Sequence, residues 1–251
     1  HRVQVLLWGR FKAIMEAHVA SLGAFAPSRS SSDVHPHFVA RRYAELISSL
    51  RLLSTPVVEP MLSNMLRVLR TEVERLFAER LVKQHPSRKA QAAFLINNYD
   101  LVVTTIAERG ARGDDSVHFE QLLDAAKAAF VEEQLIVDFG SMIAYVKQTE
   151  PLLMGSDASR VDRRQMELLT RSFHDSWKAG IESVNRDVVK SFANFKLGMD
   201  ILKQVLTQLL LYYTRFLDVV KTVHPSGPPF AQFILSIATL MSEIKHFSRN
   251  F

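Results

Sequence analysis

Four short patterns in this 251-residue sequence contain side chains that could do chemistry: His35-Pro36-His37, Arg112-Gly113-Asp114, Glu132-Glu133 and His174-Asp175. The two histidines around Pro36 have no third ligand nearby, so they do not predict a metal site. Adjacent glutamates on a helix point about 100° apart, which is poor geometry for shared acid–base work. The histidine at 174 follows Phe173 in a helical pattern, which is typical of a surface or packing residue.

Larger catalytic signatures are also missing from the sequence. It contains no glycine-rich phosphate loop, no G-x-S-x-G turn and no H-E-x-x-H zinc motif. The absence of cysteine excludes a disulfide framework and thiolate metal sites. We interpret the integrin-type tripeptide at 112–114 as coincidence. The sequence therefore predicts a protein that is not an enzyme and holds neither a cofactor nor a metal.

Basic residues form the first group of candidate binding residues. The net charge is +5, and most of that excess lies in residues 156–251. Basic residues also outnumber acidic ones over residues 67–89. Such an excess suits an acidic partner or an anionic membrane surface, although it also occurs on helix faces that are merely solvated. The candidate contact residues are Arg70, Arg80, Lys83, Arg88, Lys89, Arg160, Arg163, Arg164 and Arg171.

These charges do not predict a nucleic-acid site. Proteins that bind single strands place aromatic side chains beside the basic ones, so that bases can stack on them. Here the aromatic residues fall on apolar stripes that predict core positions. They are Phe77, Phe173, Trp177, Phe192 and Phe195.

Asn97 and Asn98 form a second group of candidates, together with Tyr99 and Asp100. Asparagine is an indifferent helix former, yet both asparagines stand inside the apolar stretch 88–109. A buried amide must find hydrogen-bond partners. The four residues therefore either fix the register of a helical bundle or form a polar recognition patch.

The stretch that must position many of these residues covers 162–223. Apolar residues recur there every three or four positions from Met166 to Val220, and no proline interrupts them. This is the α-helical period. About sixty residues in one helix would span roughly 90 Å. The pattern predicts either one very long helix flanked by others, or two stacked helices divided at Gly180 or Gly198.

The other patterns are helical too, so we predict an all-α protein, an elongated rod of consecutive helical bundles. The helix over 88–109 is apolar nearly all round, and we expect its neighbours to enclose it. We expect a helix break at 138–140 and a seam at 155–157, between a first bundle (1–155) and a second (156–251). No apolar run could span a bilayer. The expected helices outside 162–223 cover residues 1–22, 38–53, 60–84, 88–109, 116–137, 141–153 and 229–247.

Several stretches of the chain resemble one family, in order and at matching spacing. They are residues 36–45 (PHFVARRYAE), 94–100 (FLINNYD), 176–178 (SWK) and 190–195 (KSFANF). The chain resembles the C-terminal half of vacuolar protein sorting subunit fifty-two over essentially all of its length. That family supplies a subunit of the Golgi-associated retrograde protein (GARP) complex and belongs to the helical-rod (CATCHR) tethering proteins.

The resemblance implies a non-enzymatic rod that helps to tether endosome-derived vesicles at the trans-Golgi network in retrograde transport, with a sister complex in endosomal recycling. It implies other subunits of the tethering complex, SNARE proteins and a small GTPase of the Rab or Arf-like class as partners. It also implies a cytosolic protein with peripheral contact to trans-Golgi network and endosomal membranes, and no nucleic acid. Two alternatives are a helical module that binds phosphoinositide membranes and a spacer without a binding site.

Overall fold

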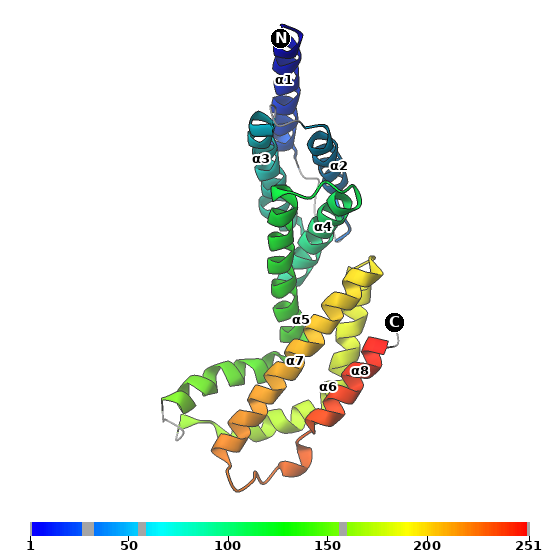
Figure 1. Cartoon of the computed structure of the whole chain (residues 1–251). Coiled ribbons are helices and arrows are strands. Elements are labelled where there is room, and N and C mark those ends of the chain that lie inside the picture. The colour runs from blue at the N-terminus through cyan, green and yellow to red at the C-terminus, as the bar shows by residue number, and fades with distance from the viewer. Residues whose placement is uncertain (1, 27–32, 55–58, 156–159, 250–251) are drawn as a thin grey trace. The chain divides into compact units, whose positions relative to one another are not determined.

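The computed structural model describes residues 2–26, 33–54, 59–155 and 160–249 (Figure 1). Within these ranges the chain forms eight α-helices and no strand, so the all-α prediction is confirmed. Short π and 3-10 turns cover Leu76–Leu81, Val82–Gln84 and Ala231–Phe233. The helices are α1 (Arg2–Ala24), α2 (Phe38–Leu53), α3 (Glu59–Arg75), α4 (Arg88–Glu108), α5 (Asp114–Met154), α6 (Arg163–Ser191), α7 (Phe195–Val223) and α8 (Ile237–Arg249).

The helices group into two compact units, His1–Ala129 and Phe130–Phe251. The division between them falls within α5. The sequence instead predicts a seam at 155–157. Residues 156 and 157 lie outside the described residues, so that seam stays a prediction. The rod shape stays a prediction as well. Each unit is described below by itself.

The first unit is built around α4, as its apolar composition predicts. Helix α4 packs against α2 and against the turns that follow α3. From Lys89 to Ile106 every residue of α4 is buried or half-buried. The ring of Tyr99 lies between those of Phe77 and Phe119, at centroid distances of 6.4 and 5.7 Å. Neighbouring elements therefore enclose α4.

Helix α5 continues through 138–140, so the predicted break there is wrong. Gly140 is helical and does not adopt a positive φ. Phe139 is buried and packs on Phe173, with ring centroids 5.9 Å apart. A glycine costs a helix only about 1 kcal/mol relative to alanine, and the burial of Phe139 offsets that cost.

The stretch 162–223 forms two helices, and they divide at neither glycine. Gly180 and Gly198 both lie inside helices. The chain leaves α6 at Phe192, whose backbone is extended, and re-enters a helix after Asn194. The Asn194 side-chain oxygen accepts a hydrogen bond from the Leu197 amide at 3.4 Å, which caps α7. Such a short connection makes α6 and α7 antiparallel neighbours that pack on each other.

Helix α8 returns along α7, as the apolar pattern near the C-terminus predicts. It begins at Ile237 rather than near 229, because Ala231–Phe233 form a 3-10 turn and Ile234 after it has an extended backbone. The Tyr213 hydroxyl donates a 2.8 Å hydrogen bond to the Leu235 carbonyl oxygen, which holds the connection against α7. None of the described helices combines the length and apolar character that crossing a membrane requires.

Candidate contact surfaces

Arg70 has a structural partner within the first unit. Its guanidinium lies 3.3 Å from the carboxylate of Asp115, which also binds Arg51 at 2.8 Å. The Asp115 side chain is only 4% exposed and the two arginine side chains 18% each. Arg70 therefore belongs to a nearly buried ion-pair cluster that joins α2, α3 and α5.

Arg80 also serves the fold of the first unit. Its Nη1 donates hydrogen bonds of 2.9 and 3.0 Å to the carbonyl oxygens of Leu22 and Gly23, in the last turn of α1. Carbonyl groups at a helix C-terminus have no partner within the helix. A cation is favoured there as well. Arg80 is thus a cap for α1 rather than a surface contact.

Three further candidates lie where the π and 3-10 turns lead into α4. Lys83 and Arg88 are exposed, and Lys89 is half-buried. The Ser87 hydroxyl oxygen caps α4 by accepting a hydrogen bond from the Ala90 amide at 3.1 Å. The first turn of α4 contains no acidic residue. Of the five candidate residues between 70 and 89, these three therefore stay candidates for a surface contact.

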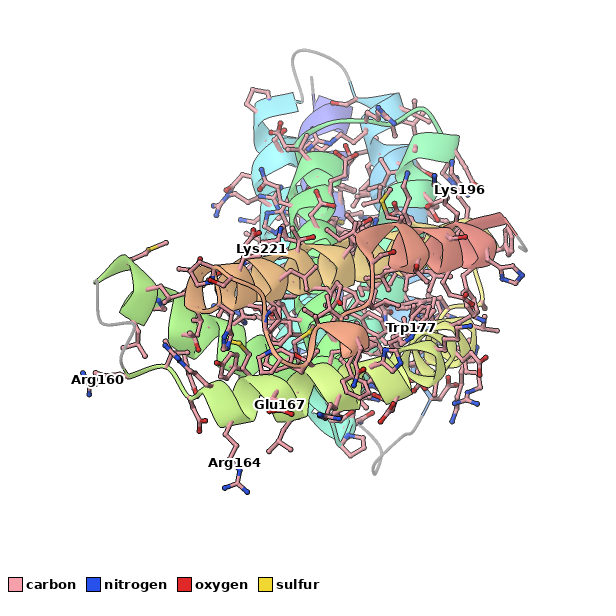
Figure 2. The ribbon with its side chains drawn as sticks, turned by 90° about the horizontal axis from the view of Figure 1, so that it is seen from below. Arg160, Arg164, Glu167, Trp177, Lys196 and Lys221 are labelled. Carbon is pink, nitrogen blue, oxygen red and sulfur yellow. The ribbon has the colours of Figure 1, made fainter. Side chains whose placement is uncertain are left out.

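The second basic group gathers at the start of α6. Arg160, Arg163 and Arg164 are exposed, and Arg160 and Arg164 point away from the ribbon (Figure 2). Arg171, two turns further on, pairs with Glu167 at 2.9 Å. Its guanidinium also lies 4.1 Å from the ring centroid of Phe233. The structure therefore brings three of the predicted residues together at one helix end, and it places Arg171, also exposed, against Glu167 and Phe233.

Asn97 and Asn98 both bind the segment that precedes α2. The Asn97 amide donates to the Val34 carbonyl oxygen at 2.8 Å, and the Asn98 side-chain oxygen accepts from the His37 amide at 2.8 Å. Asn98 is fully buried and Tyr99 nearly so, while Asp100 is half-buried. Burial raises the pKa of the Tyr99 hydroxyl. These contacts agree with a role in bundle register rather than in a recognition patch.

We expect Asn98→Ala to lower the free energy of unfolding by about 1–3 kcal/mol, because the part-buried amide of His37 loses its acceptor and the fully buried Asn98 side chain is removed. Urea denaturation followed by circular dichroism measures the change. Asn64, which is exposed on α3, supplies the matched control Asn64→Ala, for which we expect a change within about 0.5 kcal/mol. Equal stability of the two variants would contradict a structural role for Asn98.

Three of the four patterns that could do chemistry contribute a side chain to contacts within the fold, whereas Arg112 and Asp114 of the fourth are exposed. His37 caps α2, its ring nitrogen accepting from the Val39 amide at 3.4 Å, and burial lowers its pKa. Glu132 accepts hydrogen bonds from Lys147 and Tyr212, at 3.2 Å each. The rings of His174 and Phe233 pack nearly perpendicular to each other, with centroids 5.7 Å apart. No cluster of three or more potential metal ligands occurs among the described residues.

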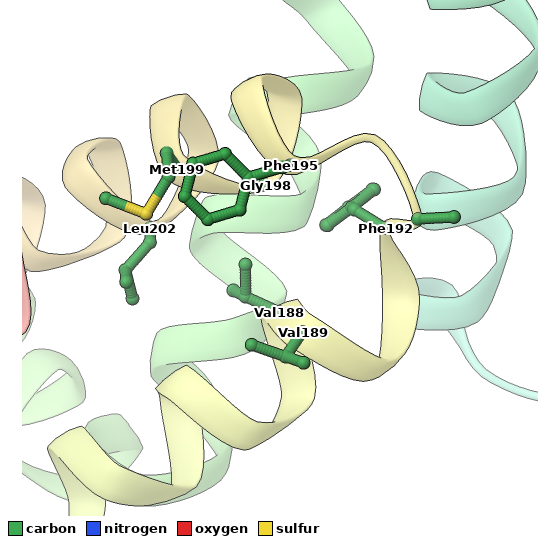
Figure 3. Close-up of a pocket in the computed structure, with 8 residues that line it drawn as sticks. Val188, Val189, Phe192, Phe195, Gly198, Met199 and Leu202 are labelled. Carbon is green, nitrogen blue, oxygen red and sulfur yellow. The ribbon is translucent and has the colours of Figure 1, made fainter. Parts of the chain in front are cut away.

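An apolar groove opens where α6 turns into α7 (Figure 3). Its volume is about 260 Å³. Phe195 and Val189 on its rim are 61% and 55% exposed, whereas Phe192 is buried and packs edge-on against Phe130. Gly198 keeps the floor open, since a Cβ there would lie 3.7 Å from the Cβ of Phe192. The lining residues are Val188, Val189, Phe192, Ala193, Phe195, Gly198, Met199 and Leu202.

Comparison with known proteins decides the family. Residues 1–131, more than half of the chain, match the family model described as "Vps52, C-terminal". The chain belongs to the Vps52 family. The resemblance found in the sequence is therefore confirmed.

Relatives match the chain along its whole length. Vacuolar protein sorting-associated protein 52 A of Arabidopsis thaliana is 38% identical over 254 residues, which cover 100% of this chain and 36% of the relative. The human homologue is 37% identical over 100% of this chain and 35% of its own length. The Caenorhabditis elegans homologue is 28% identical over 98% of this chain and 36% of its own length. The chain thus spans about a third of these Vps52 proteins. Comparison with solved structures found no match.

The sequence did not predict the groove of this Vps52-family chain. We assigned Phe195 to the core stripe, and its 61% exposure makes that assignment wrong. The other four stripe aromatics are buried, as predicted. Asn194 before Phe195 was a usable signal, because asparagine is a preferred N-cap residue and marks a helix start.

Proposed function

We propose that this chain is a non-enzymatic part of a multisubunit vesicle-tethering complex, in which it contributes reach and protein contacts. Its proposed complex is GARP, which tethers endosome-derived vesicles at the trans-Golgi network, and its proposed partners are the other subunits, SNARE proteins and a small GTPase. A role in endosomal recycling belongs to the same proposal. The observation that carries it is the Vps52 family match, because the relatives are named for vacuolar protein sorting.

The arginines at the start of α6 support a contact with an acidic partner. Arg163 and Arg164 form no ion pair within the described ranges, and α6 has no acidic residue in its first turn. A cation at a helix N-terminus costs about 0.3–1 kcal/mol, because it opposes the helix dipole. A carboxylate-rich surface docked at this end of α6 would offset that cost.

Complementation in cells tests the proposal. Cells without their own Vps52 are given the human relative in which this chain replaces the matching third. We expect the chimera to restore the trans-Golgi distribution of a recycling cargo, measured by fluorescence microscopy. A chimera that co-precipitates with the other subunits but does not restore the cargo contradicts the proposal.

Charge reversal in the same chimera tests the arginines. We expect Arg160→Glu, Arg163→Glu and Arg164→Glu together to abolish most of the restored cargo distribution while co-precipitation of the other subunits persists. The matched control reverses three exposed lysines of the second unit, Lys178, Lys221 and Lys245, and should leave the distribution intact. Equal effects of the two triple variants would remove the α6 arginines from the proposal.

Membrane binding is the second candidate function, and the same three arginines favour it. Clustered exposed cations gain about 1 kcal/mol each near an anionic membrane surface. Flotation with vesicles that contain phosphoinositides distinguishes the candidates. Flotation of the chain alone, lost in the arginine triple variant, would favour direct lipid binding over a protein partner.

A further inference from the structure

We propose that the groove between α6 and α7 binds an amphipathic helix with an acidic polar face, presented by a partner protein. The groove is formed entirely by residues of the second unit, and it is distinct from the arginines at the start of α6. The inference goes beyond the tethering function, because it rests only on the shape of this groove and on the charges around it.

The groove has the form of a site for a third helix. On α7, Phe195, Met199 and Leu202 recur at i, i+4 and i+7, so they line one side along two turns. Val188 of α6 and Phe192, the residue that follows α6, line the other side. An amphipathic helix that docks between two helices presents anchors at this same spacing.

The volume of the groove fits side chains rather than a cofactor. Small-molecule sites usually enclose about 300–1,000 Å³, and this groove holds about 260 Å³. A cavity of about 150 Å³ already accommodates one benzene molecule. One or two large apolar side chains of a docked helix would therefore fill the space.

The charges around the groove determine which kind of helix fits. Arg186, Lys190, Lys196 and Lys203 are exposed, and Asp200 is the only exposed carboxylate between positions 186 and 203. In the part of the chain that the structure describes, none of the four cations is paired with a carboxylate.

Two of these cations border the apolar surface directly. Lys196 and Lys203 lie one turn to either side of Met199 on α7. By contrast, Lys221 near the other end of α7 has an acidic partner in Asp218 at 3.7 Å. The four exposed cations outnumber the one exposed carboxylate, Asp200, so this edge of the groove carries a net positive charge that complements an acidic helix.

The concave shape argues against a membrane as the occupant. Val188, Phe192 and Leu202 lie in the floor, where each is at most 4% exposed. A flat bilayer surface would reach Phe195 and Val189 on the rim and leave this floor uncovered. A helix whose side chains project into the groove covers both the rim and the floor.

A designed peptide tests the proposal on the 251-residue chain. The peptide is an amphipathic helix with leucine at i, i+3, i+4 and i+7 and glutamate elsewhere, and fluorescence anisotropy measures its Kd. We expect binding that weakens as salt rises. Phe195→Ala should weaken it about tenfold, the usual effect of losing a central anchor. Leu211→Ala, at a 49% exposed site on α7 outside the groove, should leave it unchanged.

A charge swap tests the role of the rim. With Lys196→Glu and Lys203→Glu together, we expect the acidic peptide to bind more weakly and a lysine version of the peptide to bind more tightly. Lys221 lies at the opposite end of α7 from Lys196 (Figure 2), so Lys221→Glu is the matched control and should change neither.

Several results would overturn the proposal. One is a Kd above about 1 mM for the acidic peptide. The others are equally tight binding of a scrambled peptide and a Kd that is unchanged in Phe195→Ala. Binding to phosphatidylserine vesicles that Phe195→Ala abolishes would replace the helix by a lipid surface. Self-association lost in Phe195→Ala, seen by sedimentation, would replace it by a second copy of the chain. Cargo retrieval in cells plays no part in these measurements, so the proposed function is tested separately.

Discussion

Asp115→Ala should lower the free energy of unfolding by about 3 kcal/mol, the largest effect that we expect from a single polar side chain. Asp115 neutralises Arg51 and Arg70, whose side chains are 18% exposed. Its removal would leave two nearly buried cations without their shared anion. The first turn of α5 would also lose a carboxylate that the helix dipole favours. Urea denaturation followed by circular dichroism measures the loss.

Asp124 supplies the control for this prediction. It lies on the same helix and is exposed. Asp124→Ala should change stability by no more than about 0.5 kcal/mol. If Asp115→Ala proved as stable as Asp124→Ala, the ion-pair cluster would add nothing to the packing of α2, α3 and α5.

Gly180→Ala should destabilise the second unit by about 1–3 kcal/mol, although alanine is the better helix former. A Cβ at position 180 would lie 2.5 Å from Cζ and 3.0 Å from Cε1 of the Phe139 ring. Phe139 is itself buried against Phe173 and has little room to move. The two helices would have to separate, or the ring would have to leave its rotamer. Denaturation and hydrogen exchange of α5 and α6 measure the effect.

Gly140→Ala is the matched control for Gly180→Ala. Both glycines lie inside helices, but a Cβ at position 140 would meet only Ile136, at an ordinary 3.5 Å. We therefore expect Gly140→Ala to stabilise the chain by up to about 1 kcal/mol. Stabilisation by both substitutions would show that α5 and α6 pack less closely at Phe139 than the structure indicates. Phe139→Leu in the Gly180→Ala background should recover part of the loss, because the smaller side chain relieves the overlap.

The candidate site could be predicted only in part. The sequence reveals where basic residues lie along the chain, and it led to Arg160, Arg163 and Arg164, which do gather at one helix end. It assigned Arg70 and Arg80 to the same class of surface residues. Their partners, Asp115 and the last carbonyls of α1, are 45 and more than 50 residues away in sequence, so only the tertiary structure distinguishes a structural arginine from an exposed one.

The sequence alone determined that this protein is helical and belongs with the Vps52 family. Helix formation and apolar periodicity are local properties, because each turn involves neighbours three and four residues apart. Tertiary packing decided where the helices end. Burial of Phe139 carried α5 through Gly140, and burial of Phe192 against Phe130 ended α6 before Asn194 capped α7. That turn exposed Phe195 and created the groove, since a side chain's surroundings depend on elements that a one-dimensional pattern does not bring together.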